Sequence, residues 1–146
     1  MKSYDAAGVW ERVQSAPAAD PQNLMGLMEA LQLELRIFQL LSRKLPPAQA
    51  APARELSRLA QRHFACLQGM HVLLCGTAPQ LRPQPIPTDP PELLLRQCCG
   101  RILRLRGEYE SRRSDPAHGP IFRLLANELA QYNRLALELL AALAKS

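Results

Sequence analysis

Hydrophobic side chains recur at steps of three and four residues along four long stretches of the chain, which polar or proline-rich segments separate. This spacing places apolar groups on one face of an α-helix, the face that a bundle buries. Each stretch holds about 24 residues, or roughly 36 Å of helix at 1.5 Å per residue, so the four helices are of similar length. The pattern predicts helices at 21–45, 52–75, 90–113 and 119–144, and a shorter extra helix at 4–15 around Trp10.

Proline marks several of the expected helix ends. Asp20-Pro21 combines a side chain that caps a helix N-terminus with the residue favoured at the first helical position. Pro46-Pro47 is interpreted as the stop after the first helix, because proline cannot donate the backbone hydrogen bond that continues a helix. The sequence therefore predicts that Pro52 opens the second helix.

The lengths of the links predict how the helices are connected. The first and third links have about six residues, which forces each pair of helices into an antiparallel hairpin. The middle link, 77–89, is rich in proline and spans roughly 43 Å when extended at ~3.1 Å per residue, enough to run the length of a helix. We therefore predict an all-α fold, a four-helix bundle of two antiparallel hairpins joined by a long Pro-rich crossover. The bundle would occupy residues 20–146 and follow an N-terminal extension at 1–19.

Two ionisable side chains interrupt the apolar seams of the predicted helices. Glu34 lies near the middle of the first helix and His63 near the middle of the second, so both should lie at similar depth. An unpaired buried carboxylate costs several kcal/mol, so it forms a pair, takes up a proton or binds a metal. The other expected seam residues are Leu27, Leu31, Phe38, Leu41, Leu45, Leu56, Ala60, Leu67, Met70, Leu74, Leu95, Cys98, Ile102, Leu105, Tyr109, Phe122, Leu125, Leu129, Tyr132, Ala136, Leu139 and Leu143.

Two parts of the chain resemble a known family. The segment LQGMHVLLCG (67–76) is similar to the end of the second helix of rubrerythrin-type proteins, and residues 94–140, with the link EYE…SDP…GPIF, resemble their second hairpin. The two halves also match each other, since ELR (34–36) aligns with ILR (102–104). The resemblance covers roughly residues 20–144 and implies a ferritin-like four-helix bundle.

The resemblance also implies which positions would hold a di-iron site. The family supplies a Glu from one helix of each hairpin and a Glu-x-x-His pair from the other. Only Glu34 and His63 remain as a remnant pair of metal ligands in this sequence. The vacated ligand positions hold Ala60, Ile102, Leu129 and Tyr132. Shifting the fourth helix by one residue would substitute Glu128 and Gln131, but Glu128 lies off the apolar seam.

These substitutions predict that no intact di-iron site exists, because a single carboxylate cannot hold two cations against their mutual repulsion. We expect Glu34 to hydrogen-bond His63 or a buried polar group such as Tyr132 instead. The alternative is a mononuclear site in which Glu34 and His63, with or without a cysteine, hold iron or zinc.

The four cysteines, Cys66, Cys75, Cys98 and Cys99, are expected to be free thiols packed as small hydrophobic groups. Their spacing matches no familiar zinc motif, since Cys98 and Cys99 are adjacent. They therefore predict neither a disulfide framework nor a separate zinc site.

Charge and composition change this picture only slightly. The formal charge of +5 could favour nucleic acid, but the arginines are scattered and aromatic residues, 5% of the chain, do not interleave with a basic run. The chain contains no apolar run long enough to cross a membrane, and its first twenty residues lack a secretory core. We therefore expect a cytoplasmic protein that binds neither membranes nor nucleic acid.

The sequence favours a non-catalytic structural or interaction module with no cofactor. The alternative is the mononuclear metal protein, related to rubrerythrin-like oxidoreductases. Apolar side chains beside the main seams predict a dimer or a protein partner. Those on the first helix are Leu24, Met28, Leu35 and Ile37, and those on the fourth are Leu135, Leu137 and Leu140.

Overall fold

The computed structural model describes residues 21–145, which form four α-helices and no strand within that range. The helices are α2 (Pro21–Lys44), α3 (Pro47–Cys75), α4 (Pro91–Ser111) and α5 (Gly119–Lys145). The expectation of an all-helical chain with four long helices is confirmed. The extra helix predicted around Trp10 lies outside the described residues.

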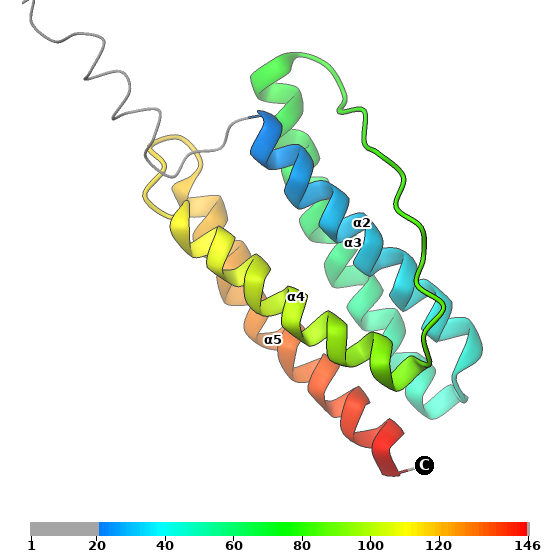
Figure 1. The fold of residues 1–146 in the computed structure, drawn as a ribbon. Coiled ribbons are helices and arrows are strands. Elements are labelled where there is room, and N and C mark those ends of the chain that lie inside the picture. Colours follow the sequence, from blue (N-terminus) through cyan, green and yellow to red (C-terminus); the bar gives the residue numbers. More distant parts are fainter. Residues whose placement is uncertain (1–20, 146) are drawn as a thin grey trace, which may run out of the picture.

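The helices pack as two hairpins that lie side by side (Figure 1). α2 packs closely along α3, and α4 packs along α5. The two hairpins meet chiefly through α3 and α5, whereas α2 and α4 touch at only a few points. The bundle is therefore tight on one side and open on the other, between α2 and α4.

The segment between α3 and α4 runs alongside α2 (Figure 1). The Glu29 carboxylate accepts hydrogen bonds from the backbone N–H of Arg82 (2.7 Å) and from its guanidinium (3.3 Å). About two helical turns further along α2, Arg36 donates to the Gln84 carbonyl (3.3 Å). Leu81, just before Arg82, packs against the core. These contacts attach the segment to α2. The segment ends at the opposite end of the bundle, where α4 begins (Figure 1).

The start of α3 differs from the expectation. The helix begins at Pro47, directly after Pro46, and Pro52 lies inside it. Proline at the first helical position loses no hydrogen bond, because that N–H has no partner within a helix anyway. Ala50 and Ala53 are buried, so the added turns pack against the bundle, which offsets the cost of Pro52.

The core contains most of the predicted seam residues and more. Leu24, Met28 and Ile37 of α2 are completely buried. The idea that they form a surplus face for a partner is therefore wrong. The reason is that α2 is covered by α3 and by the α3–α4 segment, so a wider stripe of its surface faces protein. On α5, Leu135 and Leu140 are half-buried, and Leu137 is exposed.

Candidate functional site

Glu34 and His63 are both buried in the bundle, but they do not bond to each other. Glu34 on α2 is bound by two groups of α4, whereas His63 on α3 is bound by α4 and α5. The bond expected between Glu34 and His63 is not formed, and the buried polar group that Glu34 contacts is the Cys98 thiol, not Tyr132. The core therefore contains two separate polar clusters, one on each side of the bundle.

The first cluster joins α2 to α4. The guanidinium of Arg101 forms a close ion pair with one carboxylate oxygen of Glu34. The thiol of Cys98 donates to the other oxygen at 2.8 Å. Burial raises the pKa of the Cys98 thiol, and the charge of Glu34 raises it further. Cys98 is therefore held as a protonated donor, and the carboxylate has a partner on each oxygen.

The second cluster joins α3 to α4 and α5. Nε2 of His63 lies 3.1 Å from Oε1 of Glu128, and Nδ1 lies 3.1 Å from the hydroxyl of Tyr109. The other carboxylate oxygen of Glu128 pairs with Arg62 at 2.6 Å. Burial lowers the pKa of His63, and the nearby Glu128 only partly opposes this. A neutral imidazole that carries its proton on Nε2 can donate to Glu128 and accept from Tyr109, so one tautomer satisfies both contacts.

Two residues of these clusters were missed or set aside by the sequence reasoning. Arg101 immediately precedes Ile102, and Glu128 immediately precedes Leu129. Each lies about 100° around its helix from the seam position, but a long side chain can reach back toward the core from there. Glu128 lies off the buried seam, as expected, yet its carboxylate reaches His63. The useful signal is a long charged side chain beside a seam position, opposite a buried polar residue.

The four vacated ligand positions all lie in the core. Ala60, Ile102, Leu129 and Tyr132 are each at most 2% exposed. The Tyr132 ring packs edge-on against Phe38, with centroids 5.8 Å apart, and lies 6.4 Å from the imidazole of His63. Its hydroxyl is buried and has no hydrogen-bond partner among the residues described. Burial raises the pKa of this hydroxyl, so it stays protonated.

The arrangement does not fit a di-iron centre. The charge of Glu34 is already neutralised by Arg101, and a metal ion there would face a guanidinium at close range. Ile102 and Leu129 offer no oxygen ligand. Within residues 21–145 there is also no group of three or more His, Cys, Asp or Glu side chains placed to hold a metal. Cys98 reaches Glu34, but His63 lies in the other cluster.

The cysteines are all free and differ in burial. Cys98 is buried, and Cys66 and Cys99 are partly buried against the core. Cys75, the last residue of α3, is exposed. The expectation that all four pack as small hydrophobic groups is therefore wrong for Cys75, because the end of α3 extends past the part of the bundle that could cover it.

Comparison with protein-family models, with curated proteins and with solved structures found no match to this chain. In the described part of the chain, no helix is long and apolar enough to cross a membrane.

Proposed function

We propose that the chain is a ferritin-like bundle that holds no di-iron centre and acts as a non-catalytic structural or interaction module. The layout is supported by two antiparallel hairpins and by a proline-rich segment that runs along α2 between them. The loss of metal chemistry is supported above all by Arg101. Its guanidinium provides, within the protein, the positive charge that a metal would otherwise supply to Glu34.

Buried polar groups of this kind can still be retained in a non-catalytic core. Glu34 accepts from two donors and His63 bonds at both ring nitrogens, so neither is left unsatisfied. Together the two clusters connect all four helices at the level of the bundle centre. We propose that the two clusters fix how the two hairpins pair. Directional hydrogen bonds specify one arrangement better than apolar packing does.

The first test is metal content. We expect the full chain, loaded with ferrous iron without oxygen and then desalted, to retain no more iron by elemental analysis than a Glu34→Gln variant treated identically. The reason is that iron would have to displace Arg101 and lose water without gaining enough oxygen ligands.

Two results would contradict this expectation. Retention of two irons per chain, lost in Glu34→Gln, would mean that a di-iron site is present. One iron or zinc per chain, also lost in Glu34→Gln, would establish the mononuclear site and overturn the metal-free proposal.

We further propose that the module self-associates through the apolar tip of α3. Val72, Leu73 and Leu74 are consecutive and exposed, with 82% of Leu73 accessible, at the end of a helix that extends past its neighbours. Successive side chains of a helix point about 100° apart, so these three surround the tip of α3 with apolar surface, unlike single exposed leucines, which are common on protein surfaces. A second copy is the occupant we propose, with the same patch on both protomers.

Sedimentation velocity on the full chain tests this step. We expect a dimer that dissociates in Leu73→Gln and persists in the control Leu103→Gln. Leu103 of α4 is 60% exposed, but neither of its neighbours in the sequence is an exposed apolar residue. At a protein concentration of about 100 μM even weak association is detected. A wild-type chain that stays monomeric at this concentration would refute self-association.

A further inference from the structure

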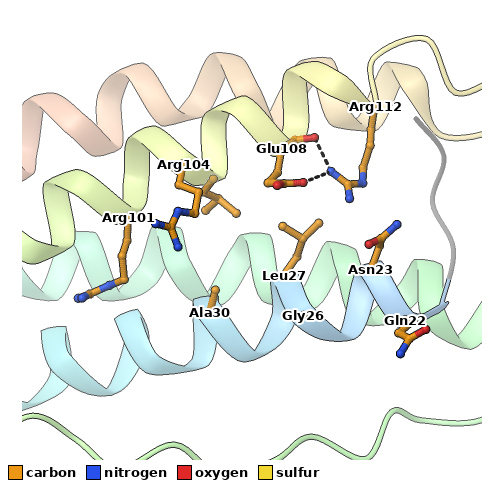
Figure 2. A pocket seen from close by; sticks show the side chains of 10 residues that line it. Gln22, Asn23, Gly26, Leu27, Ala30, Arg101, Arg104, Glu108 and Arg112 are labelled. Atoms are coloured by element: carbon orange, nitrogen blue, oxygen red, sulfur yellow. Dashed lines mark hydrogen bonds and ion pairs between the residues drawn. The ribbon is translucent and has the colours of Figure 1, made fainter. Parts of the chain in front are cut away.

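The open side of the bundle contains a cavity between α2 and α4. Its volume is about 350 Å³, within the range of small-molecule sites. Leu27 and Ala30 of α2 and Leu105 of α4 form its apolar part. Gly26 contributes no side chain, which keeps the α2 wall low. Figure 2 shows the space lying between the two helices, with the long side chains of α4 reaching over it.

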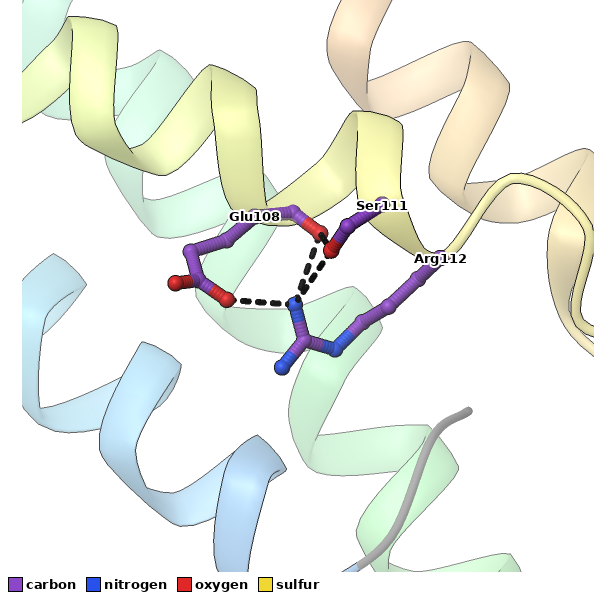
Figure 3. Close-up of polar contacts among 3 residues, drawn as sticks. All are labelled: Glu108, Ser111 and Arg112. Atoms are coloured by element: carbon purple, nitrogen blue, oxygen red, sulfur yellow. Dashed lines mark hydrogen bonds and ion pairs between the residues drawn. The ribbon is translucent and has the colours of Figure 1, made fainter. Parts of the chain in front are cut away.

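Arginine dominates the polar part of this cavity. Arg101 and Arg104 of α4 line it together with Arg112, the residue that follows the helix, and Glu108 is the one acidic residue among the described lining. Glu108 is already engaged, because its carboxylate and its backbone carbonyl accept from Nη1 of Arg112 at 2.6 and 2.7 Å (Figure 3). Arg101 is paired with Glu34. Arg104 therefore remains as a cation without an acidic partner within the described chain.

Unused donors line the same cavity. Arg112 is more than nine-tenths buried, yet its Nε has no hydrogen-bond partner within residues 21–145. Nη2 of Arg101 is also buried without a partner in that range, although 29% of the Arg101 side chain is exposed. A buried N–H that lacks an acceptor destabilises the folded chain, so an acceptor supplied from outside would recover that free energy. In Figure 2, Arg104 of α4 and Arg112 at its end extend toward the space above α2.

We propose that this cavity binds a small anionic amphiphile. A carboxylate or phosphate group would accept hydrogen bonds from Arg104, which has no acidic partner, since guanidinium groups match the geometry of both oxyanions. Nε of Arg112 is a further donor, about two helical turns away along the same cavity. A short apolar body would lie against Leu27 and Leu105. The apolar floor distinguishes this site from one for a free inorganic anion. The inference goes beyond the metal-free module proposed above, and neither depends on the other.

Calorimetric titration of the full chain with octanoate and with octyl phosphate tests the site. Octanol serves as a neutral ligand with an alkyl chain of similar length. We expect one saturable site per chain for at least one of the two anions, and the tighter of them identifies the head group. Octanol should bind at least about ten-fold more weakly, since it lacks the charge-assisted bonds. No saturable binding of either anion overturns the proposal. Equal binding of octanol also overturns it.

Matched variants locate the binding. Arg104→Gln should weaken the anion by about ten-fold or more, whereas Arg106→Gln, with the same charge change on an exposed part of α4 outside the cavity, should not. Gly26→Leu should abolish binding by filling the cavity; a Cβ at Gly26 meets no atom within 4 Å, so the helix accepts it. Gly100→Leu, equally unobstructed but outside the cavity, is its control. Equal losses in Arg104→Gln and Arg106→Gln, or binding that survives Gly26→Leu, would show that the anion binds elsewhere.

Discussion

Replacing Arg101 with leucine is expected to lower the free energy of unfolding by about 3 kcal/mol, the typical cost of breaking a buried ion pair from one side. Glu34 is 3% exposed and lies on α2, facing the core. Without the guanidinium, its carboxylate would keep only the Cys98 thiol as a donor. The chain would then have to bury a charge without its counterion, protonate Glu34 or distort α2.

The reverse substitution, Glu34→Leu, is expected to cost less. The side chain of Arg101 is 29% exposed, so its guanidinium can turn outward to water through the open side of the bundle when its partner is lost. The double variant Arg101→Leu/Glu34→Leu should recover most of the stability lost in Arg101→Leu. Two apolar groups of similar size remove the cost of taking both charges out of water.

Chemical denaturation at neutral pH measures all three variants, with Arg106→Leu as the control. Arg106 is an exposed arginine on the same helix, so its removal should change the free energy of unfolding by no more than about 0.5 kcal/mol. If Arg101→Leu costs no more than this control, the ion pair is not a structural part of the core. If the double variant is as unstable as Arg101→Leu, the loss comes from packing at position 101 and not from the unpaired carboxylate.

The fold was largely predictable because it depends on local patterns. The three-and-four spacing of leucines identified all four helices, and most of the seam residues are buried. Proline was informative but ambiguous, since Pro47 and Pro52 can both begin a helix. The choice between them depends on whether Ala50 and Ala53 find a surface to pack on, which is a tertiary property.

The candidate sites were much less predictable. Glu34 and His63 were correctly placed in the core, but their partners depend on how the hairpins dock. Arg101 belongs to a stretch rich in arginine that looks like a solvated face, and only the loose packing of α2 on α4 lets it turn inward. The cavity beside it has the same origin. A gap between helices that touch at few points leaves no periodic signal in the sequence.

The two buried tyrosines provide the sharpest comparison within the core. Both are completely buried, and each packs on a phenylalanine, Tyr132 on Phe38 and Tyr109 on Phe122. They differ in the hydroxyl. The Tyr109 hydroxyl bonds to Nδ1 of His63 at 3.1 Å, whereas the Tyr132 hydroxyl is buried and has no partner among the described residues.

Substitution by phenylalanine should therefore have opposite effects at the two positions. We expect Tyr132→Phe to raise the free energy of unfolding by about 1 kcal/mol, because it removes a hydroxyl that lost its bonds to water on folding. We expect Tyr109→Phe to lower it by about 1–2 kcal/mol, because Nδ1 of His63 then loses its donor in the core. The measurement is denaturant unfolding of both variants at pH 7.5, where His63, with its lowered pKa, is neutral in wild type.

Each variant acts as the control for the other, since both lose one oxygen atom from a buried ring of the same kind. Changes of the same sign would mean that the packing of the rings outweighs their hydroxyl bonds. A loss of stability in Tyr132→Phe alone would identify an acceptor for that hydroxyl in the folded chain. Tyr132 would then belong to the same polar network as Glu34, whose charge already raises the pKa of the Tyr132 hydroxyl.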